Sequence, residues 1–385
     1  FLKIILPLGI SFYTFQTISY VVDVYRNKNK PENNFILYAC YVTFFPQLIA
    51  GPILRSSEVI PQFKNRIPFK IDFIFDGFKR VIYGLFLKVV LADNIAPLVD
   101  TGFAMNVESL SGIDIWTLAF LFGFQIYFDF SAYSHIAIGS AKMIGLNFPE
   151  NFNFPYLSNS PKEFWQKWHI SLSSWIRDYL YLPLINLKII NNSTGGLNFV
   201  FEKYYFGPLF LTWAIMGFWH GANWTFLIWG IFHAIIIAIY RVINPIYSIL
   251  PFSNKFQIGI IFTLPLVMIS WIPFRSENIH QALEMWLKIL YPSNYLWMGL
   301  RENTYLAASL MMIGIFIFYF LNKNYYLLLN KVKSLIIISE ILNDNNKKIN
   351  HASKKYPISG NISTTYNNKI TDTGSMGIND VRFVK

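Results

Sequence analysis

A histidine stands near the centre of the longest stretch of the chain that carries no charged side chain. The stretch covers residues 204–240, and His220 lies in it within the string Gly-Phe-Trp-His-Gly-Ala-Asn-Trp, 217–224. A neutral imidazole accepts a proton near pH 7, so it can act as the general base that deprotonates a hydroxyl group. Asn223 follows three residues later, close enough on a helix to orient the same ligand. The alternative is a histidine that only packs between helices and hydrogen bonds to a neighbouring one.

A second histidine, His169, lies in a segment rich in tryptophan. The apolar residues that would share one face of a helix there are Trp165, Trp168, Leu172, Trp175 and Ile176, and the charged residues between or beyond them are Lys167, Arg177 and Asp178. Tryptophan and tyrosine beside lysine and arginine are typical of a membrane interface. The pattern therefore favours an amphipathic helix that lies at the interface. The alternative makes His169 a second active-site group that points into the protein.

An aspartate, Asp129, lies within the apolar segment 115–138. A carboxylate inside a membrane span usually pairs with a cation, and Lys88 and Arg177 are the plausible partners. We predict a structural ion pair rather than a catalytic acid. His233, in an apolar helix, is predicted to be a packing residue. The histidines are scattered and not paired with carboxylates at ligand spacing, so no metal site is predicted.

The composition indicates which elements must position these groups. Hydrophobic residues make up 54% of the 385 and charged residues only 14%, against a usual ~25% in soluble domains. This excludes a disordered chain and argues against an ordinary soluble protein, so we expect an all-α, polytopic integral membrane protein. The net charge of +11 then reflects basic loops that face the cytoplasm and anionic membrane lipid, and no nucleic acid partner is predicted.

Uncharged or nearly uncharged runs predict seven or eight membrane elements. They are 4–22, 33–54, 81–99, 115–138, 204–240 as two spans with a break at Gly221, 256–274 and 303–322. Two prolines and a glycine within 44–52 break the second run, so we predict a re-entrant segment with Gln47 among the polar groups that line an interior path. The basic loops 26–30, 55–80 and 142–203 are predicted to lie in the cytoplasm, and 100–114 outside.

Seven strings of residues occur in an order that resembles one family of membrane enzymes. They are 6–16, 44–52 leading into Arg55, 84–94, 127–131, 168–179, Phe218-Trp219-His220-Gly221, and 271–275. Together they are similar to the membrane-bound O-acyltransferase (MBOAT) family, in its branch that modifies bacterial cell-envelope polymers. That branch includes alginate O-acetyltransferase membrane proteins, peptidoglycan O-acetyltransferases and the membrane protein of teichoic-acid D-alanylation.

The resemblance implies a helical ring around a transmembrane tunnel, which the acyl donor enters from one face and the hydroxyl acceptor from the other. His220 matches the family's active-site histidine, and His169 matches its second characteristic polar position. We therefore predict a multi-pass O-acyltransferase of the bacterial cytoplasmic membrane that moves acetyl groups from a cytoplasmic donor toward a cell-envelope polysaccharide. An alginate-like polymer, peptidoglycan, another exopolysaccharide and teichoic acid are all open as acceptors. The residues predicted to line the substrate path are Asn223, Trp219, Asp129, Arg177, Asp178 and Gln47.

No metal or redox cofactor is implied, and acetyl-CoA or a similar acyl donor is expected as a substrate. The predicted partners are membrane lipid, the acyl donor and the polysaccharide acceptor, which an extracytoplasmic acetyltransferase would help to modify. The hypothesis from another class is a polytopic transporter or flippase without acyl chemistry, because broken segments and buried polar groups fit that function too.

Two features depart from the family pattern. The branch commonly has an aspartate where this chain has His135, which puts any ion pair at that place in doubt and gives Asp129 more weight. The organisation predicted is an O-acyltransferase domain over 1–342, expected to lack the two or three helices that the family has before its first motif. The second departure is the polar tail over 343–385, which has no counterpart in the family and is expected to be disordered.

Overall fold

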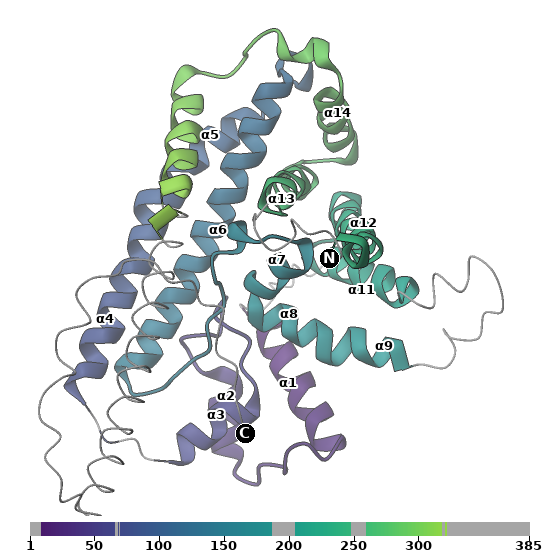
Figure 1. The fold of residues 1–385 in the computed structure, drawn as a ribbon. Coiled ribbons are helices and arrows are strands. Elements are labelled where there is room, and N and C mark those ends of the chain that lie inside the picture. The colour runs from purple at the N-terminus through teal and green to yellow at the C-terminus, as the bar shows by residue number, and fades with distance from the viewer. Residues whose placement is uncertain are drawn as a thin grey trace, which may run out of the picture. The chain divides into compact units, whose positions relative to one another are not determined.

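Helices make up all the regular structure that is described. The structure is a computed structural model of the 385-residue chain, and it describes residues 9–65, 68, 70–186, 205–247, 259–317 and 320–321. Within these ranges there is no strand, in agreement with the predicted all-α class (Figure 1). The chain separates into two units, residues 1–314 and 315–385. The predicted tail, 343–385, lies outside the described residues.

In the first unit, the long helix α6 lies beside a second helical run that consists of α4, η1 and α5 (Figure 1). The elements are α4 (Ile71–Leu85), the π-helical segment η1 (Phe86–Ala92), α5 (Asp93–Phe103) and α6 (Gly112–Met143). Gly77 of α4 faces Gly139 of α6, and each glycine lies against the other's carbonyl oxygen. A side chain at either position would keep the backbones apart, so these two glycines permit close packing of the helices.

Three helices in the described part of the chain are long and apolar enough to cross a membrane. They are Ile71–Phe103, Gly112–Met143 and Trp224–Pro245, and shorter apolar helices cover Gly259–Arg275 and Glu302–Ile317. The first two contain the predicted segments 81–99 and 115–138, so their charged residues do not interrupt the helices. Membrane crossing by the other predicted segments stays a prediction.

The uncharged run 204–240 forms two helices, as its sequence predicts. α11 (Phe206–His220) ends at the residue before Gly221, and α12 (Trp224–Tyr247) begins three residues after that glycine. α13 (Gly259–Arg275) and α14 (Ile279–Leu290) follow. The break predicted at Gly221 is therefore confirmed, and it leaves His220 at a helix end.

The chain between residues 33 and 64 is not one continuous helix. α2 (Phe35–Thr43) has nine residues, 44–55 are non-helical, and α3 (Ser56–Lys64) follows. The non-helical part is buried at Pro46, Gln47 and residues 51–54. It is held by hydrogen bonds from the Tyr41 hydroxyl to the Leu54 carbonyl (3.0 Å) and from the Ile53 N–H to Ser171 Oγ (2.9 Å). The helix break predicted from Pro46, Gly51 and Pro52 is confirmed.

The tryptophan-rich segment does not form the single amphipathic helix that its pattern predicts. It consists of α7 (Pro161–Lys167), α8 (Ile170–Ile176), the π-helical η4 (Arg177–Tyr181) and α9 (Leu182–Asn186). Between α7 and α8, His169 has a left-handed backbone with φ of 41°.

Buried Asn151 supplies the reason for this turn. Its carbonyl oxygen accepts the Ile170 N–H at 2.8 Å, and its Oδ1 accepts both the N–H (3.2 Å) and the hydroxyl (2.8 Å) of Ser171. These bonds hold the first turn of α8 away from the axis of α7. They come from a residue outside the segment, so the local pattern could not reveal them.

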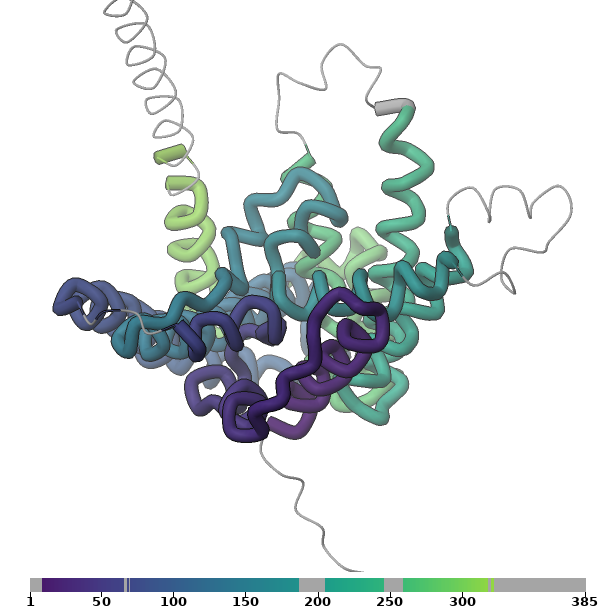
Figure 2. The backbone as a smooth tube through the Cα atoms, turned by 90° about the horizontal axis from the view of Figure 1, so that it is seen from below, coloured from purple at the N-terminus to yellow at the C-terminus, as the bar shows by residue number. Residues whose placement is uncertain are grey.

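The first helix described, α1 (Ile10–Tyr25), packs against α8 and η4 (Figures 1 and 2). Trp175 Nε1 donates a hydrogen bond to the Phe15 carbonyl at 2.9 Å, and the Tyr179 hydroxyl donates to Asp23 Oδ2 at 2.6 Å. Segments about 160 residues apart are thereby joined beside the two histidines that the sequence singles out.

Candidate active site

His220 is the last residue of α11 and lies in a cage of aromatic rings. Its ring centroid is 4.6 Å from that of Trp219, 4.9 Å from Trp229, 5.0 Å from Phe274 and 6.3 Å from Phe226. Trp229 and Phe274 meet the imidazole nearly at right angles. These surroundings offer the imidazole no ion pair among the described residues. A histidine so placed is neutral and available to accept a proton.

His169 is buried, with 4% of its surface exposed. Its ring lies 4.5 Å from Phe130 in an edge-to-face contact, and its Nε2 is buried with no hydrogen-bond partner. It is close enough to His220 for a charge on one ring to act on the other. The turn between α7 and α8 therefore points the His169 side chain into the protein, as the alternative expects, whereas the position of the segment at the membrane interface stays a prediction.

Further aromatic rings connect the neighbourhoods of these two histidines. Trp168, adjacent to His169 in the chain, lies 5.1 Å from Trp271, which lies 6.3 Å from Trp229 beside His220. On another side, Trp219 lies 5.4 Å from Phe15 of α1. Trp219 thus packs between His220 and α1, and its place along the substrate path stays a prediction.

Gln47 lies in the non-helical stretch 44–55 and is 1% exposed. Its Nε2 donates to the Tyr41 carbonyl at 3.4 Å, whereas its Oε1 is buried without a partner. An unpaired buried amide oxygen costs free energy unless water or a ligand satisfies it. This agrees with a polar interior path, but the hydrogen bond of Gln47 goes to Tyr41 and not to either histidine.

Asp129 forms the ion pair that the sequence predicts, and Lys88 is its partner. Lys88 Nζ lies 2.7 Å from Asp129 Oδ1 and 2.9 Å from Asp93 Oδ1, so one ammonium joins α6, η1 and the start of α5. The alternative partner, Arg177, instead pairs with Asp178. Asp129 is thus engaged with Lys88, and none of its recorded contacts reaches His169 or His220.

We expect the Asp129→Asn variant to lose stability rather than activity. Lys88 keeps Asp93 as a partner, so the unfolding temperature of the protein purified in detergent should fall by about 2 °C. The predicted acetyl transfer, measured per folded molecule, should be retained. A tenfold loss of transfer with an unchanged unfolding temperature would instead place Asp129 on the substrate path.

Arg177 and Asp178 belong to a charged network at the beginning of η4. Arg177 Nε lies 2.8 Å from Asp178 Oδ1, and Arg55 Nη2 lies 3.6 Å from Asp178 Oδ2. The Arg55 guanidinium also stands 4.4 Å from the ring centroid of Tyr179. The network ties the start of α3 to η4, and Arg177 additionally lines the cavity described below.

Asn223 does not share a helix with His220, because α11 has ended. Its Oδ1 accepts the N–H of Thr225 at 3.2 Å at the start of α12, and its Nδ2 donates to the Glu277 carbonyl at 3.2 Å. Both polar ends of the side chain are therefore used to position backbone. The expectation that the two residues lie on one helix is wrong, although they remain close in the chain.

His135, the residue that departs from the family pattern, lies on α6. Its ring meets Tyr83 of α4 edge to face at 4.8 Å, and its Nδ1 is buried without a partner. The ion pair of Arg80 with Glu150 lies close enough to act on it electrostatically. His135 therefore belongs to the packing of α4 against α6.

His233, predicted only to pack, has a more specific role in the structure. It is fully buried, accepts a hydrogen bond at Nδ1 from Trp165 Nε1 (3.3 Å), and stacks on Trp213 at 5.2 Å. Trp229 lies 4.9 Å from His233 and 4.9 Å from His220, so the same indole contacts both imidazoles. The four-residue spacing of Trp229 and His233 on α12 is the only signal in the sequence that could have linked His233 to the site.

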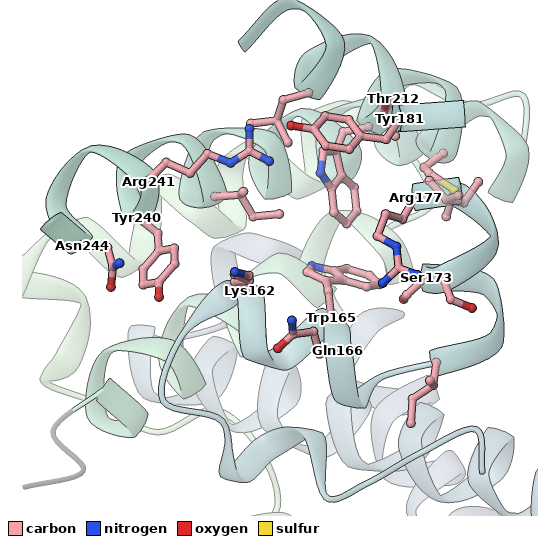
Figure 3. A pocket seen from close by; sticks show the side chains of 17 residues that line it. Lys162, Trp165, Gln166, Ser173, Arg177, Tyr181, Thr212, Tyr240, Arg241 and Asn244 are labelled. Atoms are coloured by element: carbon pink, nitrogen blue, oxygen red, sulfur yellow. The ribbon is translucent and has the colours of Figure 1, made fainter. Parts of the chain in front are cut away.

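The structure also contains a cavity that the sequence does not predict, and Trp165 and Trp213 form part of its lining (Figure 3). Its volume is about 570 Å³, and side chains of α7, α8, η4, α11 and α12 form its wall.

In the described part of the chain, no group of three or more His, Cys, Asp or Glu side chains could hold a metal ion. The neighbourhood of His220, His169 and His233 consists of aromatic rings and of imidazoles, of which His169 and His233 each have a buried Nε2 without a hydrogen-bond partner.

Comparison with known proteins gives this arrangement a family. Residues 28–274 match the model of MBOAT, the membrane-bound O-acyltransferase family. The chain is 43% identical over 283 residues to a probable alginate O-acetylase AlgI of Azotobacter vinelandii, a match that covers 74% of this chain and 53% of that protein. It is 38% identical over 310 residues to a peptidoglycan O-acetyltransferase of Helicobacter pylori, covering 74% and 56%.

A more distant relative is a teichoic acid D-alanyltransferase of Bacillus subtilis, 28% identical over 287 residues, covering 71% of this chain and 69% of that protein. The chain spans about half the length of the alginate and peptidoglycan relatives. The family match includes both His169 and His220. On the strength of these matches and of its membrane-compatible helices, the chain belongs to the membrane-bound O-acyltransferase family.

Proposed function

We propose that this chain carries the acyl-transfer site of a membrane-embedded O-acyltransferase that moves acetyl groups from a cytoplasmic donor toward hydroxyls of a cell-envelope polysaccharide. The observation that carries the proposal is the pair His220 and His169. One imidazole lies at a helix end in an aromatic cage, and the other presents a buried, unpartnered Nε2 within electrostatic range. Relatives named as O-acetylases and O-acetyltransferases support the acetyl group and the polymer acceptor.

In the proposed reaction, His220 accepts the proton of the attacking hydroxyl while its oxygen bonds to the acyl carbon of a thioester such as acetyl-CoA. The tetrahedral intermediate then expels the thiolate, which takes up the proton from His220 and leaves as a thiol. His169, protonated at Nε2, donates a hydrogen bond to the oxyanion during this step. Acetyl-CoA is a substrate here, and no resident cofactor enters the proposal.

The architecture that we propose around this site is a helical ring with a tunnel, in the cytoplasmic membrane of a bacterium. The acceptor would reach the site from the outer face, where an extracytoplasmic acetyltransferase partner completes the modification. Gln47, buried in the non-helical stretch 44–55, would line this path as part of a re-entrant segment. Such a break in helical structure is tolerated at membrane depth where protein covers it or where it faces a cavity.

The ion pair of Lys64 with Glu32 supports the re-entrant arrangement. Its atoms lie 2.5 Å apart, so the two ends of the segment 32–64 meet at one place. The Lys64 ammonium, hydrogen bonded to the carboxylate, lowers the pKa of Glu32 and keeps it charged at neutral pH. A segment closed by two charged groups in this way enters and leaves on the same side of a membrane.

Cysteine labelling tests this topology. Cys40 is the only cysteine, so a Cys40→Ser background allows single cysteines to be introduced as Lys30→Cys and Asn65→Cys. Neither change removes the ion pair of Lys64 with Glu32. Both cysteines should react with a membrane-impermeant maleimide only after the cytoplasmic face is exposed. Labelling from opposite faces would rule out the re-entrant segment.

Acetyl transfer itself is tested with purified protein and labelled acetyl-CoA. Alginate-like polymer and peptidoglycan fragments should be offered separately as acceptors, because relatives carry both names. Label that appears on one polymer, or as hydrolysed acetate, supports the enzyme. A transporter or flippase would move a substrate without consuming acetyl-CoA, and that outcome would replace the proposal.

A further inference from the structure

We propose that Trp229 donates a hydrogen bond from its indole N–H to the carbonyl oxygen of the acyl donor. The inference rests on the proposed function and adds a further catalytic residue to the same site. Trp229 lies on α12 and is 1% exposed. Its ring centroid is 4.9 Å from that of His220, with the two rings nearly perpendicular. The indole N–H therefore belongs to a ring that contacts the imidazole which takes up the hydroxyl proton in the proposed reaction.

The indole N–H of Trp229 is buried without an acceptor. Among the described residues, its Nε1 has no hydrogen-bond partner. An indole nitrogen can only donate, and an N–H left unpaired in a protein interior costs free energy that a ligand or a water molecule can recover. Trp229 also belongs to the candidate span Trp224–Pro245, where lipid offers no acceptor. An acceptor must therefore reach the N–H from within the protein.

The rings packed on Trp229 do not supply that acceptor. Phe274 and Trp271, 5.3 Å and 6.3 Å away, have no accepting atom in their side chains. His233 lies 4.9 Å away, but its Nδ1 already accepts the N–H of Trp165 at 3.3 Å. A neutral imidazole that accepts at Nδ1 carries its proton on Nε2, so His233 presents a second donor rather than an acceptor.

Close packing of α11 on α12 holds Trp229 in this position. Gly217 of α11 lies against the Phe226 carbonyl oxygen, and Gly230, the residue after Trp229, lies against the Trp213 carbonyl oxygen. A side chain at either glycine would separate the two helices. The indole N–H is therefore fixed in place before a substrate arrives, as a donor that stabilises developing charge should be.

The proposed reaction brings one acceptor to this place that gains negative charge, the carbonyl oxygen of the thioester. Preorganised N–H groups beside such an oxygen stabilise the tetrahedral intermediate. Trp229 would provide one of them and His169, with its buried and unpartnered Nε2, the other. The indole keeps its proton throughout. The proton of the attacking hydroxyl still passes to His220 and from there to the leaving thiolate.

Two analogues of acetyl-CoA test whether Trp229 binds the carbonyl oxygen. In the first, a methylene group replaces the thioester sulfur, so the ketone oxygen remains and no acyl group can be transferred. The second, S-ethyl-CoA, has no carbonyl oxygen. Titration calorimetry of the whole protein purified in detergent should show that the ketone binds more tightly, by about fivefold to a hundredfold, because S-ethyl-CoA leaves buried donors unpaired.

Removing only the indole N–H assigns this preference to Trp229. In Trp229→benzothienylalanine a sulfur atom replaces the N–H and the shape of the ring is kept, so the protein should fold normally. The preference for the ketone should fall by about fivefold or more, and turnover of acetyl-CoA should fall by about 10²–10³. Trp229→Phe, which also lacks the N–H, should lose the preference in the same way.

The same replacement at Trp286 is the matched control. Trp286 of α14 donates its indole N–H to the Ile269 carbonyl at 3.0 Å, and its ring packs on Phe232. Trp286→benzothienylalanine therefore also loses an N–H, but it should keep both the preference for the ketone and the turnover.

The binding measurements separate failure of this inference from failure of the proposed function. If the Trp229 variants keep the full preference for the ketone, a buried water takes the N–H and the role of Trp229 is wrong, while the proposed acyl transfer stands. Equal binding of the two analogues by the unchanged protein would have the same meaning. If the unchanged protein binds neither analogue, acetyl-CoA is not the donor, and the proposed function is overturned together with the role of Trp229.

Discussion

Replacing His220 with alanine should lower acetyl transfer by about 10²–10⁴, the usual contribution of a general base. The imidazole lies among Trp219, Trp229 and Phe274 with no ion-pair partner in the described ranges. Its loss therefore breaks no charged network that holds the fold. His220→Ala protein should accumulate in the membrane at a level close to that of the unchanged protein, as measured by immunoblot of membrane fractions.

A glutamine at the same position identifies what the imidazole does. Gln keeps some hydrogen bonding but cannot accept a proton at neutral pH, so His220→Gln should be as inactive as the alanine variant. His280→Ala is the matched control, because His280 is exposed on α14. High activity of the glutamine variant would mean that His220 orients the donor, and poor accumulation of the alanine variant would mean that it serves packing.

Replacing His169 with alanine should lower acetyl transfer by about 10²–10³, as the loss of one oxyanion donor typically does. The measurement is the turnover of labelled acetyl-CoA at saturating donor. His169 adopts a left-handed backbone, which any side chain other than glycine or asparagine adopts at a cost. A second variant must therefore carry the same backbone cost.

His169→Gln meets that requirement, because its side-chain amide supplies an N–H near the place of the imidazole Nε2. It should recover part of the activity that the alanine variant loses, with similar stability for both. If glutamine is as inactive as alanine at equal stability, the oxyanion role is wrong and His169 moves a proton instead.

The sequence predicts those parts of the fold and site that depend on neighbouring residues. Gly221 marks the end of α11, Pro46 and Pro52 mark the break after α2, and apolar runs mark the helices over 71–103 and 112–143. In each case the cause lies close by in the sequence, because a glycine or proline ends a helix locally and an apolar run forms the helix that it occupies. An ion pair of Asp129 was also predictable, because a carboxylate in an apolar helix needs a cation, but the sequence leaves the choice between Lys88 and Arg177 open.

The parts that the sequence does not predict depend on residues far away in the chain. The turn that buries His169 is held by Asn151, and the hydrogen bond of His233 comes from Trp165 on another helix. The sequence predicts the break at Gly221 but not the direction of the chain after it, so it does not reveal that Asn223 lies off the helix of His220. The cavity needs side chains from five elements, and no local pattern could reveal it.

The hydrogen bond between the Ile53 N–H and Ser171 Oγ also sets an order of events during biosynthesis. Ser171 is translated 118 residues after Ile53, which at 5–20 residues per second takes roughly 6 to 24 s. During that time the backbone of the non-helical stretch 44–55 lacks one of its partners, and lipid cannot supply it. This stretch must therefore wait near water or the translocation machinery, and it enters the protein interior only after α8 has been made.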